Sequence, residues 1–468
     1  MLQRNLCAAA VMLACASFSH AASSDELKEI RQQIAAMKAQ YEARISQLEN
    51  KLAQAENKVE QASHVAERVE VLEQTRQPVL SSPSVLPQGS ASASGFNPEI
   101  SLILDGKFAS TQRPPSSYAI QGFVPTGGEI APPGRGLSLG ETELGISGSV
   151  DHLFRANVRF SMAGEAGSSS IKTEEAHIQT LGLGDGYKLK AGRFLSGIGY
   201  LNVQHPHQWD FVDAPLAYKA FWGSRLSQDG AQVKWVAPTD LFFELGGEVA
   251  HGASFPGATN DRSTPANSAL FAHLGGEWNA SNAWQTGLSY VRSEAQGRTY
   301  KDSAELTNSF EGLSQTWIAD FVWKWAPNGN AKVRSFKLQS ELFSRTETGD
   351  MSYDTATPVT TDSYRSRQTG GYAQAVYQFM PKWRVGYRYD WLDSGTIEFG
   401  PRLTPSNFAE LSAYRPRRNS VMMDWSPSEF SRLRLQMARD ESRGEGLGDN
   451  QFFLQYIMSI GAHGAHKF

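Results

Sequence analysis

From about Phe96 to the last residue, apolar and polar side chains alternate one by one along successive short runs. In the run 383–391 one face carries Trp383, Val385, Tyr387, Tyr389 and Trp391, and the other carries Arg384, Gly386, Arg388 and Asp390. Successive side chains of a β-strand point to opposite faces, so one face here is apolar with aromatic ends and the other is charged. A barrel in a bilayer shows apolar residues to lipid, aromatics at both interfaces and polar residues to a wet lumen. The alternation therefore predicts a transmembrane β-barrel.

The alternating runs predict sixteen antiparallel strands, an even number as single-chain bacterial barrels require. They are expected near 99–109, 137–149, 152–163, 171–182, 186–195, 226–237, 240–251, 268–279, 282–293, 314–326, 331–346, 366–380, 382–393, 417–426, 430–441 and 450–468.

The connections between these runs are alternately short and long. Short ones such as Pro238-Thr239 and Ala280-Ser281 consist of turn-forming residues, whereas 110–136, 196–225, 252–267, 294–313, 347–365 and 394–416 are long. Periplasmic turns are short in such barrels and external loops are long, which predicts that the N-terminus lies in the periplasm.

The residues before the barrel predict three segments. Arg4, an apolar stretch to Phe18 and a small-residue site at Ala21 predict a signal peptide over 1–21. Residues 22–75 repeat apolar residues at spacings of three and four without Pro or Gly, which predicts a periplasmic coiled coil. Residues 76–96, rich in Pro, Gly and Ser, predict a flexible linker, so the barrel is expected over 97–468.

Composition limits the function classes. The formal net charge of −4 gives no case for nucleic-acid binding. Both cysteines, Cys7 and Cys15, lie in the predicted signal peptide, so the mature chain is expected to hold no disulfide. The chain ends on Phe468, and the alternate positions before it are His466 and Gly464 and then apolar residues from Ala462 back to Phe452. In the families that this resembles, a terminal aromatic residue after alternating apolar residues is the signal for the barrel-assembly machinery, and His466 and Gly464 depart from that pattern.

Charged residues on the polar faces of the strands fall into groups. Basic residues are expected at Arg155 and Arg159 and, in a second group, at Arg384, Arg388, Arg432 and Arg434, while acids gather on other strands, at Glu141, Glu143, Glu175, Glu244, Glu248 and Glu277. Segregated charge in a narrow pore orients and selects charged solutes. The alternative is that neighbouring strands simply pair these charges without selectivity.

The third long connection, 196–225, is too rich in aromatic and apolar residues to lie free in water, so it is expected to pack inside the barrel. Here the chain resembles the sixteen-stranded trimeric porins, whose third long loop folds inward and narrows the pore. The resemblance implies a constriction in which Asp210 and Asp213 of the loop face the arginines of the wall. A periplasmic coiled coil before the barrel resembles the DcaP-like porins, which pass small dicarboxylates; it implies a homotrimer and a coil that sets pore register or touches peptidoglycan.

The phrases from Phe96 to Gly106 and from Ala191 to Tyr200 look like a proteobacterial group catalogued as zinc-regulated outer-membrane proteins. His205 and His207, with Asp210 and Asp213, offer imidazole and carboxylate ligands suited to zinc. The alternatives are transient binding of passing cations, or hydrogen bonds that hold the loop to the wall. We expect no resident cofactor.

Three functions remain to be compared. The first is a passive, partly selective diffusion channel of the Gram-negative outer membrane for small organic anions or metal ions. The second is a zinc-regulated receptor or transporter that imports divalent metal; an energy-coupled mechanism would need 22 strands and a globular plug. The third is an enzyme, but Gly136-Leu-Ser138-Leu-Gly140 opens a strand and so lacks the strand-to-helix turn of a nucleophile elbow. The sequence favours the channel and no enzyme.

Overall fold

A computed structural model describes residues 98–127, 130–165, 168–258, 263–356 and 358–461. The chain divides into two units, Met1–Ala91 and Ser92–Phe468, and all described residues belong to the second. The predicted signal peptide, coiled coil and linker, and Phe468, lie outside the described residues.

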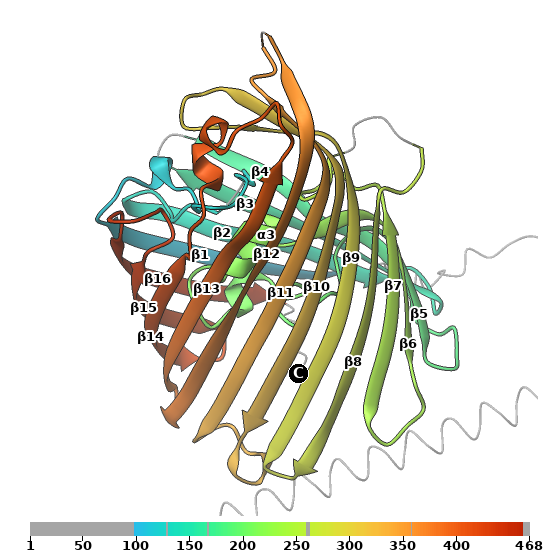
Figure 1. The fold of residues 1–468 in the computed structure, drawn as a ribbon. Coiled ribbons are helices and arrows are strands. Elements are labelled where there is room, and N and C mark those ends of the chain that lie inside the picture. The colour runs from blue at the N-terminus through green and yellow to red at the C-terminus, as the bar shows by residue number, and fades with distance from the viewer. Residues whose placement is uncertain (1–97, 128–129, 166–167, 259–262, 357, 462–468) are drawn as a thin grey trace, which may run out of the picture. The chain divides into compact units, whose positions relative to one another are not determined.

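The second unit is a closed barrel in which each strand pairs antiparallel with its neighbours in sequence and β1 closes the ring against β16 (Figure 1). The sixteen predicted strands are confirmed. They are β1 (Glu99–Thr111), β2 (Gly136–Ser149), β3 (Phe154–Glu165), β4 (Ser168–Thr180), β5 (Tyr187–Leu195), β6 (Ser227–Val236), β7 (Phe242–Ala250), β8 (Asn267–Asn279), β9 (Asn282–Lys301), β10 (Thr307–Trp325), β11 (Ser335–Tyr353), β12 (Thr360–Met380), β13 (Trp383–Phe399), β14 (Arg417–Ser428), β15 (Ser431–Asp440) and β16 (Asp449–Gly461).

Helical segments occur only in connections within the described part of the chain. They are α3 (Leu216–Trp222) and the short 3₁₀ turns η1 (Pro115–Ser117), η2 (Pro206–Gln208), η3 (Pro327–Gly329), η4 (Pro405–Asn407) and η5 (Ala409–Leu411). Among the described residues, no helix combines the length and the apolar composition needed to cross a bilayer. Ser138 lies within β2 and pairs with Lys107 of β1, so it does not occupy the sharp turn of a nucleophile elbow.

Several long loops are shorter than predicted, because the strands that flank them extend further. β9 continues to Lys301 and β10 begins at Thr307, so most of 294–313 is strand, and β11, β12 and β13 extend in the same direction. Beyond a membrane the outward face no longer needs apolar residues, so the alternation fades while the hydrogen-bonded ladder continues. By contrast, 112–135, 196–226 and 400–416 remain connections without strands.

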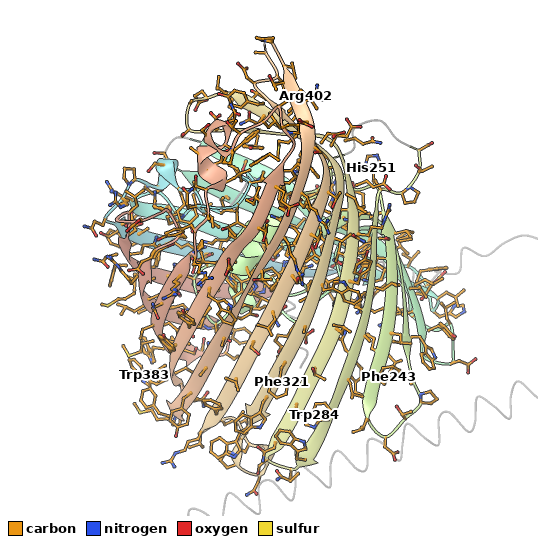
Figure 2. The ribbon with its side chains drawn as sticks, viewed as in Figure 1. Phe243, His251, Trp284, Phe321, Trp383 and Arg402 are labelled. Atoms are coloured by element: carbon orange, nitrogen blue, oxygen red, sulfur yellow. The ribbon has the colours of Figure 1, made fainter. Side chains whose placement is uncertain are left out.

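The outward face of the barrel is apolar. Exposed Leu245, Leu270 and Leu288 belong to its aliphatic band, and an aromatic row lies near the end that carries the short turns. Figure 2 shows Trp284 and Trp383 near that end, with His251 and Arg402 toward the other. Trp383 stacks on Trp425 with ring centroids 6.0 Å apart. This distribution is the one expected of a lipid-facing surface.

The aromatic row is not continuous around the ring. The pairs Trp278–Trp284 and Trp323–Phe336 belong to strands β8 to β11, whereas the sequences of β1 to β4 contain neither Trp nor Tyr. Most outward positions there are aliphatic, although the exposed side chains include Phe108 and Phe154. Ile146, Val158 and Ala176 are cross-strand neighbours. We call β1–β4 the aliphatic wall.

The interior of the barrel is filled on one side by residues 196–225, which we call the inward loop. Its helix α3 lies within the ring of strands (Figure 1). Tyr218 and Phe221 of α3 pack on Phe343 of β11, with ring centroids 5.3 Å and 5.6 Å away. They belong to one buried cluster that also includes residues of β8, β9, β10, β12 and β13. The prediction that this connection packs inside the barrel is confirmed.

Candidate pore constriction

Side chains of the wall hold the backbone of the inward loop. The amide N–H of Gly197 donates to Glu248 of β7 at 2.7 Å, and that of Leu201 donates to Glu341 of β11 at 2.9 Å. The amide of Leu216 donates to Asp390 of β13 at 3.0 Å. A buried amide without a hydrogen-bond partner destabilises the folded protein. Inward-facing carboxylates on three strands therefore accept the hydrogen bonds of loop amides that have no neighbouring strand.

Gly199 allows the loop to approach the wall closely. Its φ of +57° lies in the left-handed region, and a Cβ atom there would come within 2.3 Å of the Glu341 carboxylate. Glu341 also accepts hydrogen bonds from the hydroxyls of Tyr218 and Tyr372, at 2.8 Å and 2.7 Å. A larger residue at 199 would therefore displace both the loop and this buried carboxylate.

Asp210 contacts the wall as predicted. Its carboxylate pairs with Arg384 of β13 at 3.0 Å and with Lys337 of β11, and it accepts a hydrogen bond from Gln374 of β12 at 3.2 Å. Burial opposes the charged form, but Lys337 and Arg384 outweigh it and hold the pKa of Asp210 below its usual value. The carboxylate is therefore ionised at neutral pH.

Asp213 binds three cations at once. It pairs with Arg388 of β13 at 3.2 Å, with Lys219 of α3 at 3.1 Å and with Arg418 of β14. Burial would raise the pKa of Asp213, but Arg418, Lys219 and Arg388 together hold it well below its usual value. Arg418 was not predicted, although it shares the inward face of β14 with Ser420 and Asp424.

The remaining predicted arginines differ in their contacts. Arg434 donates to the Trp209 carbonyl at 2.8 Å and pairs with Asp424 at 2.8 Å, and Arg432 lies 3.5 Å from the same carbonyl. Arg159 pairs with Glu143 of β2 at 2.7 Å. Arg155 contacts Glu99 and Ser147, near the ends of β1 and β2 that lie beside the short turns, and not the inward loop.

Many lumen charges pair across strands, and yet basic residues remain in excess in one group. We call the inward-facing residues Lys324, Lys337, Arg384, Arg432 and Arg434 the basic cluster. Against these five cations stand two carboxylates, Asp210 and Asp424, leaving a surplus of three positive charges (5 − 2). The side chains of Lys337, Arg384 and Arg432 keep 21%, 23% and 24% of their surface exposed.

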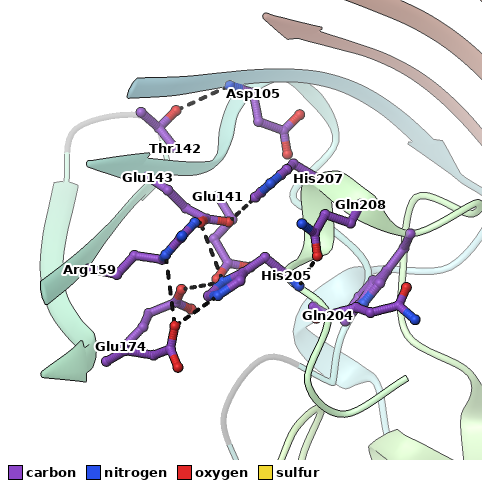
Figure 3. Close-up of polar contacts among 12 residues, drawn as sticks. Asp105, Glu141, Thr142, Glu143, Arg159, Glu174, Gln204, His205, His207 and Gln208 are labelled. Atoms are coloured by element: carbon purple, nitrogen blue, oxygen red, sulfur yellow. Dashed lines mark hydrogen bonds and ion pairs between the residues drawn. The ribbon is translucent and has the colours of Figure 1, made fainter. Parts of the chain in front are cut away.

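A second group of charged residues surrounds the two loop histidines, and we call it the His–Glu cluster. It consists of Glu141 and Glu143 of β2, Arg159 of β3, Glu174 and Glu175 of β4, and His205, His207 and Arg225 of the inward loop (Figure 3).

Each histidine faces carboxylates of the wall. His205 Nδ1 lies 3.3 Å from Oε2 of Glu143 and 3.3 Å from Oε2 of Glu174, and His205 Nε2 lies 3.1 Å from Glu175. His207 Nδ1 lies 2.9 Å from the other oxygen of Glu143. The expected ligand partners Asp210 and Asp213 are wrong, because those carboxylates bind arginines and lysines of the loop and the wall.

A β-bulge explains why sequence periodicity missed Glu174. Arg159 pairs with Glu175 and the next residue of β3, Phe160, pairs with Thr173, so Glu174 is the extra residue of β4. A bulge re-aims a side chain that strict alternation would place on the opposite face. Glu174 can therefore reach Arg225 of the inward loop, 2.6 Å away, and join Glu175 in the cluster.

The two histidines have opposite acid–base properties. Burial lowers the pKa of His205, but Glu143, Glu174 and Glu175 more than compensate and raise it to about 9. Burial also acts on His207 and here it prevails, so its pKa lies below the usual value. Without a metal ion, His205 is therefore a cation at neutral pH and His207 is neutral.

An open cavity of about 390 Å³ lies beside the His–Glu cluster. β4 and β5 pair only between Ala176–Gln179 and Lys190–Arg193, and they diverge beyond that stretch. The cavity is lined by residues of β4, β5 and β6, by 251–254 and by the end of the inward loop, and these residues include Glu174 and Arg225. The cluster is thus reachable from solvent on the side opposite the short turns.

The comparisons place the chain in a family. It is 31% identical over 405 residues to a protein of Aquifex aeolicus (strain VF5) described as an uncharacterized protein, and the match covers 81% of each chain. The chain belongs to the same family as that protein. No family model matches the chain.

Several solved structures of outer-membrane proteins resemble it at low identity. A loop-deletion mutant of OmpT from Vibrio cholerae is 9% identical with a TM-score of 0.49, and covers 78% of this chain and 99% of its own. The outer membrane channel DcaP of Acinetobacter baumannii is 13% identical with a TM-score of 0.44 (80% and 99%), and an anion-selective porin from Comamonas acidovorans is 10% identical with a TM-score of 0.42 (78% and 99%). The barrel architecture rests on the strand pairing of this chain itself.

Proposed function

We propose that this protein is a porin of the Gram-negative outer membrane that gives small charged solutes a passive, partly selective path and prefers small organic anions. The observation that carries the proposal is the inward loop, which lies inside a closed sixteen-strand barrel and is held against the basic cluster. A loop that narrows a polar lumen sets a size limit, and fixed charge beside it sets a charge preference.

The charge of the basic cluster supports anions over cations. Lys337, Arg384 and Arg432 are partly exposed, and the cluster keeps its surplus of three positive charges after pairing with Asp210 and Asp424. Rings of Lys and Arg are the usual selectivity device of anion and phosphate pores. A small carboxylate or dicarboxylate has the charge and the size that such a site favours.

The alternative, a zinc-regulated receptor or transporter that imports divalent metal, has less support. The barrel has sixteen strands, whereas the energy-coupled outer-membrane transporters need 22. A metal ion crossing the lumen would also have to pass the basic cluster, which repels it. The His–Glu cluster favours binding of a cation in one place rather than its passage.

We propose a homotrimer, which the uneven aromatic row supports. Trp and Tyr mark lipid interfaces, and the aliphatic wall β1–β4 has neither. We infer that this wall faces a second copy of the chain, while the aromatic strands β8 to β14 face outer-membrane lipid. The predicted coiled coil over 22–75 would then join three chains on the periplasmic side, and Phe468 would serve the barrel-assembly machinery.

Reconstitution tests the proposal. Purified mature protein in planar bilayers is expected to give stepwise, ohmic conductance, and proteoliposomes are expected to swell faster in a small dicarboxylate than in a diamine of equal size. Matched proteoliposomes containing the Arg432→Gln variant are expected to lose part of that difference. No conductance from folded protein, or faster uptake of the diamine, would contradict the proposal.

A further inference from the structure

We propose that Glu143, Glu174 and His205 form a site for one divalent transition-metal ion that fastens the inward loop to the barrel wall. Each residue offers one ligand atom, and the three atoms lie within 4.8 Å of one another. Two of the residues come from the wall strands β2 and β4 and the third from the loop. A metal ion here would join segments that are distant in sequence.

The spacing of the ligand atoms fits a small tetrahedral ion. His205 Nδ1 lies 3.3 Å from Oε2 of Glu143 and 3.3 Å from Oε2 of Glu174. Zinc binds imidazole nitrogen and carboxylate oxygen at about 2.0–2.2 Å, so neighbouring ligands of a tetrahedral site lie about 3.4 Å apart. The three protein ligands would leave a fourth position to water or to another oxygen.

The surrounding residues orient these ligands as the partners of metal-binding residues do. His205 Nε2 lies 3.1 Å from Glu175, the carboxylate–histidine arrangement that fixes which imidazole nitrogen binds the metal. One oxygen of Glu143 lies 2.9 Å from His207 Nδ1, and the other, Oε2, lies beside His205 and also pairs with Arg159 at 2.7 Å. Figure 3 shows Glu143 between the two loop histidines.

The charge of the cluster matches a divalent ion. The four carboxylates of the His–Glu cluster carry −4 and its two arginines carry +2, so the cluster has a charge of −2 when both histidines are neutral (−4 + 2). A divalent ion would neutralise it. Mixed imidazole and carboxylate ligands suit zinc and its neighbours in the first transition row.

The site is also accessible. Oε2 of Glu174 is buried, and His205 Nδ1 lies 3.3 Å from it without a well-aligned hydrogen bond. Glu174 also lines the open cavity of about 390 Å³, which provides a path for the ion. A divalent ion would bind this buried oxygen and His205 Nδ1 together, in place of the proton on the imidazole.

Metal binding to the intact, detergent-solubilised protein tests this inference without any measurement of transport. After chelator treatment and dialysis, Zn²⁺ is titrated calorimetrically and Co²⁺ is added to record visible absorption. We expect one ion per chain and the strong visible bands of tetrahedral Co²⁺. His205→Gln and Glu174→Gln are each expected to weaken Zn²⁺ binding at least tenfold, and Glu175→Gln to weaken it by 10- to 100-fold.

His273→Gln is the matched control, because His273 is equally buried and pairs with Glu244 at 3.3 Å on other strands. It is expected to bind like the unaltered protein. Absence of a stoichiometric ion in the unaltered protein would overturn the inference and would mean that protonated His205 alone joins the carboxylates. Undiminished Zn²⁺ binding in His205→Gln would overturn it equally. Neither result bears on whether the barrel conducts, so the proposed porin function is judged separately.

Discussion

Removal of one carboxylate, Asp213→Ala, tests whether the inward loop is held by ion pairs. Asp213 is bound by Arg388, Lys219 and Arg418, whose side chains are 2%, 3% and 0% exposed. The substitution leaves three buried cations without their shared partner. Removing one member of a buried ion pair costs roughly 3–5 kcal/mol, and each 1.4 kcal/mol is a tenfold change in an equilibrium. The equilibrium between attached and detached loop should therefore shift by about two to three and a half orders of magnitude toward the detached form.

Single-channel recording in planar bilayers measures this shift. The Asp213→Ala channel is expected to show a larger mean conductance and frequent transitions between levels, because the detached loop no longer narrows the lumen in one position. The control is Asp393→Asn. Asp393 pairs with Arg415 at the surface, where 39% of the Asp393 side chain and 73% of the Arg415 side chain are exposed, so this pair contributes little to stability. A folded Asp213→Ala channel with unaltered conductance and unaltered noise would refute the electrostatic account of the loop.

Three further predictions follow from the same contacts. The pKa values of Asp210 and Asp213 are lowered in the folded protein, so their contribution to stability is present above the usual carboxyl pKa and is lost only as the pH falls through the lowered values. Conductance should therefore keep one level from pH 7 to pH 5, and a change of level within that range would contradict the assignment. Arg432→Gln should reduce the anion-to-cation permeability ratio by up to about tenfold, because a unit charge about 6 Å from a solute in water favours an anion and disfavours a cation by about 0.7 kcal/mol each; an unchanged ratio would show that Arg432 does not face the solute. Val158→Arg on the aliphatic wall should dissociate the oligomer in native electrophoresis while Leu288→Arg on β9 should not, and the reverse result would place the interface elsewhere.

The barrel could be predicted because a bilayer imposes a period of two that local sequence displays. Trp383, Val385 and Tyr387 record that period directly, and the even number of strands follows from counting such runs. The ends of β9 to β13 could not be predicted in the same way. Thr307 and Tyr353 lie in parts of strands that no lipid contacts, so apolar side chains are not required there. The strands continue to pair, but apolar and polar residues no longer alternate in the sequence.

The contact between loop carboxylates and basic residues of the wall could be predicted, but only some of the residues that make it. Asp210 and Arg384 met as expected, because an acidic inward loop and a basic wall attract each other across the lumen. Lys337 and Arg418 were missed, since the sequence of a strand does not show which loop residue an inward-facing side chain will reach. Glu174 was hidden by a bulge, a feature of strand pairing that no single strand reveals.

The carboxylates that the two histidines contact are set by the tertiary fold and not by proximity in sequence. Asp210 and Asp213 are the two acids of the loop that carries His205 and His207, yet the partners of these histidines come from β2 and β4. The loop folds across the barrel, so its two ends meet different strands. The sequence pointed to the two histidines but not to the carboxylates that they contact.

The preference for anions is the central claim, and the reversal potential in asymmetric salt tests it most directly. Purified protein is inserted into a planar bilayer with a tenfold KCl gradient, and the zero-current voltage is recorded. The surplus positive charge of the basic cluster predicts a reversal potential displaced toward that of chloride. A potential displaced toward that of potassium would contradict the account.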